Sequence, residues 1–154
     1  MADPRQAHPD RPPVSQAGLL NQPRVSLDLA QRAIAAVIEQ AAADARPMAA
    51  VVADDRGHVI CCARMDGAPE RVLRFAVRKA YTAAVMGRDT VAFKRQMEAT
   101  GRSLADYGDA QFTTLQGGVV AIWQGQVVGA VAVGGNTAER DEEIARQALI
   151  LLGF

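Results

Sequence analysis

Histidine, cysteine and aromatic residues are scarce in this sequence, whose 154 residues include two His, two Cys and 5% aromatics. Two cysteines exclude a multi-disulfide framework and a Cys-rich zinc site, and we predict no metal site. Neither charge is in excess, because 17 Lys and Arg balance 17 Asp and Glu. Proteins that bind nucleic acid or anionic membranes typically carry a basic excess, so neither is expected as a partner.

Long apolar runs are missing as well. The sequence contains no stretch of about 18 apolar residues, so no transmembrane helix is predicted. Residues 1–24 have no apolar segment of the kind that marks a secretory signal. Five of the seven prolines fall in this segment. We therefore predict a flexible proline-rich tail over 1–24, or an arm that docks on a neighbour, followed by one domain over 25–154. The expected location is cytoplasmic.

Apolar periodicity and turn residues predict an α/β fold of the α+β type, with two hairpins in one antiparallel sheet and helices packed on it. Helices are expected from Ser26 to about Arg46, over about 70–86, from Thr90 to Gly101, and after Asn136 or Thr137. Strands are expected at 48–53, 58–64, 119–123 and 126–133, with one further short strand in the loop 102–118. The predicted order is α-β-β-α-α-β-β-β-α.

The same periodicity predicts which side chains are buried. Besides small residues, the second helix buries Phe75 and the last helix buries Leu151. Cys61 and Cys62 are adjacent on a strand and are expected to be small buried hydrophobes rather than a redox pair. The second hairpin is apolar on both faces, which predicts helices on one face and another subunit on the other.

Charged residues at two places are candidates for chemistry. Arg64 and Asp66 end a strand: either Arg64 binds a carboxylate and Asp66 lines the same cleft, or the two pair and Asp66 caps the next turn. Lys79 and Thr82 lie on one face of the second helix. Facing the sheet, Lys79 is partly desolvated, which lowers its pKa and suits a base, a nucleophile or an anion anchor. Alternatively, Lys79 extends to solvent.

Glycine pairs and one histidine are weaker candidates. The Gly117-Gly118 pair either lets backbone N–H groups approach a ligand or forms a turn or bulge. The Gly134-Gly135 pair precedes a helix whose acidic first turns already use the helix dipole, which argues against phosphate binding there. His58, beside a turn, is expected to be exposed or simply hydrogen-bonded unless it binds a ligand.

Several ordered motifs resemble those of the GlcG/HbpS family. They are 51–59 (VVADDRGHV), 64–68 (RMDGA), 78–84 (RKAYTAA), the Gly117-Gly118 pair, 128–133 (VGAVAV) and 141–145 (DEEIA). The resemblance covers about residues 25–152. It implies a profilin-like domain, similar to the C-terminal domain of PduO-type proteins, and homo-oligomers from dimer to octamer.

The resemblance also implies a shared site between the second helix and the sheet. Its recurring polar positions fall on Arg64, Asp66, Lys79, Tyr81, Thr82, Gly118 and Asp141. Some family members bind haem and are described as haem-degrading, while others lie in catabolic operons. This chain has LQGGVV at 115–120, where many members carry Pro-Gly-Gly-hydrophobic-Pro, so its ligand-facing loop differs.

Together these features favour an oligomeric small-molecule-binding protein, a cofactor-independent enzyme that acts on a small organic acid or ring-derived carbonyl compound. In this hypothesis Lys79 is the base or Schiff-base former, and Asp66 or Tyr81 moves protons. The expected substrate-binding residues are Arg64, Thr82, Gly117, Gly118 and Gly135. Two alternatives stay open: a haem-binding protein with His58 as a ligand, and a non-catalytic ligand carrier.

Overall fold

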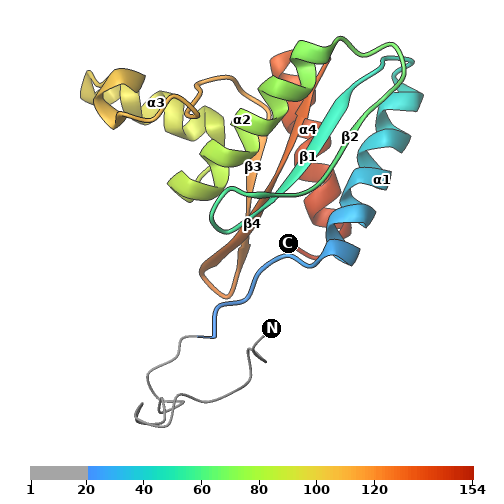
Figure 1. Ribbon diagram of the computed structural model, residues 1–154, viewed down its shortest axis with the longest axis horizontal. Helices are drawn as coiled ribbons and strands as arrows, with labels where there is room; N and C mark the ends of the chain where they lie inside the picture. The colour runs from blue at the N-terminus through green and yellow to red at the C-terminus, as the bar shows by residue number, and fades with distance from the viewer. Residues whose placement is uncertain (1–20) are drawn as a thin grey trace, which may run out of the picture.

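The computed structural model describes residues 21–154, which form one four-stranded sheet with helices on both faces (Figure 1). The strands are β1 (Ala49–Asp54), β2 (Val59–Arg64), β3 (Gly118–Trp123) and β4 (Gln126–Gly134). All neighbours are antiparallel, in the order β2-β1-β4-β3. The predicted fold class and both predicted hairpins are therefore confirmed.

The helices follow the predicted pattern with two differences. They are α1 (Leu27–Ala43), α2 (Glu70–Met86), α3 (Thr90–Thr100), the 3₁₀ helix η2 (Leu104–Tyr107) and α4 (Ala138–Leu151). The prediction of a strand in the loop 102–118 is wrong. Ser103 and Asp106 instead form a capping box that stabilises the start of η2. The first helix ends before Arg46, because Ala45 adopts a left-handed conformation with φ of 51°.

Helix ends agree with local side-chain chemistry. The Ser26 hydroxyl accepts a hydrogen bond from the Leu29 amide at the start of α1, and Thr137 caps α4 in the same way. Gly87 and Gly101 follow α2 and α3 with φ of 62° and 66°, the left-handed conformation that glycine adopts without strain.

Both faces of the sheet are covered within one chain. Helices α1 and α4 lie on one face, and α2 lies on the other (Figure 1). On the α2 face, Ala76 and Ala80 pack against Val51, Ala53 and Ala132, so small side chains bring the helix close to the sheet. The second face of the β3–β4 hairpin is therefore covered by α2, and the prediction that another subunit covers it is wrong.

Four residues predicted to be buried are partly or largely exposed. Phe75 is 39% exposed because it lies at the edge of the buried stripe of α2, and Leu151 is 66% exposed at the last turn of α4. Cys61 is partly buried and Cys62 is exposed, because β2 is an edge strand with incomplete cover. The expectation that both cysteines are buried is therefore wrong.

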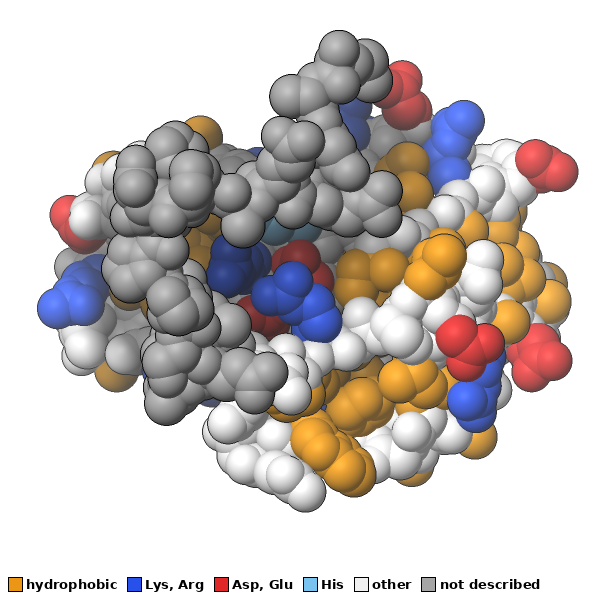
Figure 2. Space-filling model, turned by 60° about the horizontal axis from the view of Figure 1, so that its bottom comes forward, with side chains coloured by type: hydrophobic (Ala, Val, Ile, Leu, Met, Phe, Trp, Pro, Cys, Tyr) orange, Lys and Arg blue, Asp and Glu red, His pale blue; other side chains and the backbone are white. Residues whose placement is uncertain are grey.

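Most of the predicted tail, 1–24, lies outside the described residues. Within residues 21–154, no helix has the length and apolar character needed to cross a membrane. Figure 2 shows the end of the molecule where α1 begins and α4 ends. Hydrophobic side chains gather on the part of this surface that grey atoms do not cover, with few charged groups among them (Figure 2).

Candidate functional site

A buried ion pair joins α2 to α4 at the end of β4. Lys79 and Asp141 are only 5% and 3% exposed. The Lys79 ammonium donates to Asp141 Oδ2 at 3.0 Å and to the Val133 carbonyl oxygen at 2.8 Å. Of the two readings of Lys79, the sheet-facing one therefore describes the structure, and the side chain does not extend to solvent.

Burial changes the acid–base properties of this lysine. Desolvation lowers the pKa of Lys79 from its ordinary value of 10.5, and the charge and hydrogen bond of Asp141 offset part of that shift. A lowered pKa increases the fraction of neutral amine, which is the form that accepts a proton or attacks a carbonyl carbon. The carboxylate is placed to take or return a proton at the Lys79 Nζ atom.

Asp141 is itself held in place through its second oxygen. Its Oδ1 atom accepts a hydrogen bond from the Asn136 amide at 2.9 Å. The Asn136 side chain reaches Asp44, which also forms a 2.8 Å ion pair with Arg140. The first turn of α4 is thus tied to the end of α1, and the carboxylate faces Lys79 with both oxygens bonded.

Two glycines allow the backbone to approach Lys79. Gly117 has φ of 115°, and a Cβ atom there would lie 2.8 Å from Lys79 Nζ. A Cβ atom at Gly118 would lie 2.5 Å from the Lys79 carbonyl oxygen. Any side chain at these positions would displace the helix or the lysine, so the pair permits close packing over Lys79.

An open cleft of about 380 Å³ reaches the buried pair. Its apolar side chains are Val72, Phe75, Leu115 and Ala138, and its polar ones are Lys79, Gln116, Asn136 and Asp141. Gly134 and Gly135 complete its wall from the end of β4. Apolar walls with a few convergent polar groups are typical of small-molecule sites, which makes this cleft the candidate active site.

The structure separates Arg64 and Asp66 from this cleft. Arg64 pairs with Ala49, which pairs with Gly134, so Arg64 lies two strands from β4, a distance of about 10 Å. Its guanidinium donates to the Ala68 carbonyl oxygen at 3.1 Å. Asp66 is exposed in the following loop. Neither residue is among those that line the cleft.

Tyr81 and Thr82 also point elsewhere. The Tyr81 hydroxyl donates to Asp109 at 2.6 Å, and this hydrogen bond raises the pKa of Tyr81. The buried Thr82 hydroxyl accepts from the Thr113 amide at 3.0 Å. Both side chains hold the segment 109–113 against α2, and neither lines the cleft.

His58 lies on the turn between β1 and β2. Its backbone amide donates to Asp54, and its exposed ring nitrogen Nδ1 lies 3.7 Å from the same carboxylate. The structure therefore gives this histidine the simple hydrogen-bonded surroundings that the turn predicted, away from the Lys79 cleft.

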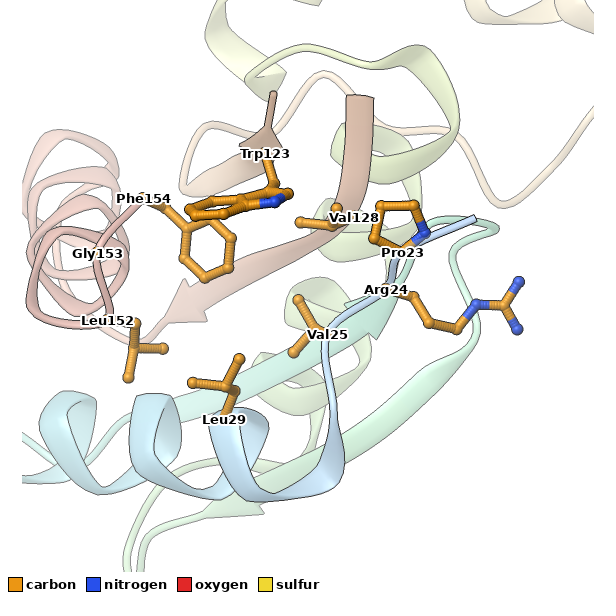
Figure 3. Close-up of a pocket in the computed structure, with 9 residues that line it drawn as sticks. All are labelled: Pro23, Arg24, Val25, Leu29, Trp123, Val128, Leu152, Gly153 and Phe154. Carbon is orange, nitrogen blue, oxygen red and sulfur yellow. The ribbon is translucent and has the colours of Figure 1, made fainter. Parts of the chain in front are cut away.

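A different hollow lies at the end of the sheet that carries the β3–β4 turn. Its volume is about 250 Å³, and it is almost wholly apolar (Figure 3). Trp123, at the end of β3, and Phe154, after the end of α4, face the hollow. The Arg24 guanidinium points away from it and pairs with Asp55 at 2.9 Å. The lining residues are Pro23, Arg24, Val25, Leu29, Trp123, Val128, Leu152, Gly153 and Phe154.

Sequence reasoning missed several cleft residues. Asp141 was predicted as a recurring polar position, but its acidic helix turn was explained by the helix dipole rather than by a partner 62 residues away. Asn136 was considered only as a possible start of the last helix, and Gln116 only as the residue before the Gly117-Gly118 pair. The helical periodicity of α2 places Lys79 facing the sheet, but no local signal reports which residue a buried lysine contacts.

Comparison with known proteins agrees with this architecture. Residues 25–150 match the family model described as "Haem degrading protein HbpS-like". The protein GlcG of Escherichia coli K12 is 35% identical over 109 residues, which cover 71% of this chain and 80% of GlcG.

Solved structures give the same result. A double mutant of HbpS from Streptomyces reticuli has a TM-score of 0.82 at 26% identity, covering 94% of this chain and 98% of that one. The PduOC–haem complex has a TM-score of 0.77 at 22% identity over 84% of this chain and 96% of its own, a likeness of fold. With its family model, its curated relative and its fold in agreement, the chain belongs to the GlcG/HbpS family.

Proposed function

We propose that this protein binds a small organic acid or ring-derived carbonyl compound in the Lys79 cleft and acts on it without a cofactor. The observation that carries the proposal is the Lys79 amine, which is buried, has a lowered pKa and lies at the inner end of an open cleft. Perturbed titratable groups in clefts mark candidate catalytic sites.

The chemistry follows from the two partners of the amine. As a base, neutral Lys79 takes a proton from carbon beside a carbonyl group, and Asp141 stabilises the resulting ammonium. As a nucleophile, Nζ forms a bond to the carbonyl carbon, and the carbonyl oxygen leaves as water with both amine protons. Tyr81 and Asp66, first considered as proton carriers, lie outside the cleft, so Asp141 takes that role in the proposal.

The sequence offers a sharp test, because Lys79 and Lys94 are its two lysines. Pyruvate and cyclohexanone serve as probes, and sodium borohydride reduces any imine to a stable adduct that peptide mass spectrometry locates. We expect adduct on Lys79 and none after Lys79→Met. Lys94 is the matched control, because it lies on the surface of α3 beside Glu98.

A base that forms no imine is detected separately. Acetic anhydride labels neutral amines, so the pH at which each lysine reacts reports its pKa. With each labelling curve scaled to its own maximum, we expect Lys79 to react at lower pH than Lys94. We also expect a bound carbonyl compound to protect Lys79 from acetylation. Absence of adduct together with ligand binding that Lys79→Met leaves unchanged contradicts the enzyme and supports a carrier.

Haem binding is the second candidate, favoured by the family description and the PduOC–haem complex. Within residues 21–154, the usual haem ligands His, Cys, Met and Tyr line neither the Lys79 cleft nor the apolar hollow beside Trp123, so these two cavities of a single chain do not fit haem. His58 remains the proposed ligand in this case. A saturable Soret shift on hemin titration, lost in His58→Ala, supports it, and no shift at stoichiometric protein contradicts it.

We also infer that the protein forms homo-oligomers through the apolar end of the molecule. Five large apolar side chains there are more than 45% exposed: Leu27, Ile122, Trp123, Ile150 and Leu151. Exposed apolar surface of this kind marks protein contacts. Light scattering is expected to show an oligomer that Trp123→Ser and Ile150→Ser dissociate, whereas Val59→Ser on the opposite sheet edge leaves it intact.

A further inference from the structure

A second hollow of about 370 Å³ adjoins the Lys79 cleft, because Val72 and Gly135 line both. Arg46, from the connection between α1 and β1, and Arg71, from the first turn of α2, also line it. We call it the arginine hollow. Its remaining lining residues are Ala45, Pro47, Gly67 and Pro69.

Arg46 is held at the border of the two cavities by a backbone contact. Its Nε atom donates to the Gly135 carbonyl oxygen at 2.9 Å. Gly135 has φ of 126°, and a Cβ atom there would lie 2.9 Å from the Pro47 carbonyl oxygen, so the two segments are in close contact. This bond uses one N–H group of the guanidinium and leaves its two terminal nitrogens for other partners.

The two arginines of the hollow, both exposed, lack the carboxylate partners that some other arginines have. Arg74, Arg140 and Arg146 each form an ion pair with a carboxylate. Within residues 21–154, Arg46 and Arg71 have no carboxylate within 4.0 Å. Two guanidinium groups in one hollow therefore keep positive charge that these residues do not neutralise.

The start of α2 adds to the positive potential of the arginine hollow. The N-cap of α2 is Pro69, whose side chain accepts no hydrogen bond, so the positive end of a 17-residue helix faces this region. The nearest acidic residue on the helix, Glu70, is bonded to Arg74 at 2.6 Å. Asp66 is exposed in the loop before it. Arg64 donates to the Ala68 carbonyl oxygen in the same loop and does not line the hollow.

We propose that the arginine hollow binds the carboxylate of an oxo acid whose carbonyl group reaches the Lys79 amine past Val72 and Gly135. The guanidinium fork matches a carboxylate with two parallel hydrogen bonds. This inference rests on the proposed function, names its substrate class, and transfers the carboxylate-binding role predicted for Arg64 to Arg46 and Arg71.

The test compares pairs of compounds that differ by one charge. Pyruvate and levulinate separate carboxylate from carbonyl by different lengths, and their methyl esters are neutral controls. Titrations of the ¹⁵N-labelled full chain follow the backbone amides of Arg71 and Gly135. We expect saturable shifts with at least one acid, weaker with its ester, and affinity reduced about tenfold or more in Arg46→Gln and Arg71→Gln. Arg32→Gln, an exposed arginine of α1, is the matched control.

Borohydride trapping on the same samples separates the two proposals. Acid binding at the hollow without adduct on Lys79 supports the anion site and contradicts the lysine chemistry. Equal trapping of acid and ester, unchanged in Arg46→Gln and Arg71→Gln, supports the lysine chemistry and overturns the anion site. Failure of both acids to shift these amides also overturns it.

Discussion

Helix α2 carries polar side chains on two sides, and the two sides do different work. On one side, Lys79 is buried against Asp141 and faces a cleft. On the other, Tyr81 bonds Asp109, while the buried Thr82, one turn beyond Lys79 on the same face, accepts from the Thr113 amide. Arg78 joins them by donating to the carbonyl oxygens of Ala110 and Phe112. One short motif thus contains both a candidate reactive group and the anchors of a loop, so adjacency in sequence does not imply one site.

The largest difference in unfolding free energy between the two sides is expected when the carboxylate that contacts each side is removed. Asp141→Ala leaves the Lys79 ammonium buried without its counter-charge, which costs about 3–5 kcal/mol of unfolding free energy. The double variant with Lys79→Met recovers much of this loss, because no lone buried charge remains. Asp109→Ala, on the Tyr81 side, exposes its partner to water and costs less. Urea unfolding measures all three, and equal losses for the two aspartates contradict the comparison.

Gly117 tests how closely the backbone covers Lys79. Gly117→Ala places a methyl group 2.8 Å from Nζ at a left-handed φ, and we expect a loss of about 2–3 kcal/mol. Gly101→Ala is the matched control, since its φ is 66° but nothing lies within 4 Å of the added methyl. Urea unfolding gives the difference between them. If both variants lose the same amount, strain alone explains the effect and the contact with Lys79 is unimportant.

Local patterns predicted much of the fold and part of the site, for physical reasons that differ by residue. Ser26, Gly87 and Thr137 mark helix ends through bonds within four residues, so the sequence alone identifies them. Lys79 and Tyr81 are two positions apart, about 200° around a helix, and cannot face one cleft. The pairing of Lys79 with Asp141 spans 62 residues and depends on how α4 packs, which no local pattern encodes.

Thr82 tests how the segment 109–113 is anchored to α2. Thr82→Val keeps the shape of the side chain but leaves the Thr113 amide without its 3.0 Å acceptor, which costs about 1–2 kcal/mol. Hydrogen exchange at Thr113 is expected to accelerate, while acetylation of Lys79 keeps its pH dependence. A shift in the Lys79 labelling curve would show that the loop anchors and the reactive amine are coupled.

The smallest expected effect is a difference in pH dependence between the two sides. The pKa of Lys79 is lowered in the folded state, so between that value and 10.5 the unfolded chain binds more protons. Unfolding free energy therefore rises with pH across this window. The pKa of Tyr81 is raised from 10.0, so the folded state retains a proton that the unfolded state loses, and stability falls as pH increases beyond 10.0.

These opposite slopes identify the groups responsible. In urea unfolding between about pH 8 and about pH 11, the Lys79→Met/Asp141→Ala variant is expected to lose the rising limb, and Tyr81→Phe the falling one. Because the double variant removes the titrating pair Lys79 and Asp141 and Tyr81→Phe removes one group on the other side of α2, the two effects should add in the combined variant. A rising limb that survives unchanged without Lys79 would come from other groups, and the lowered pKa of its amine would then not account for the slope.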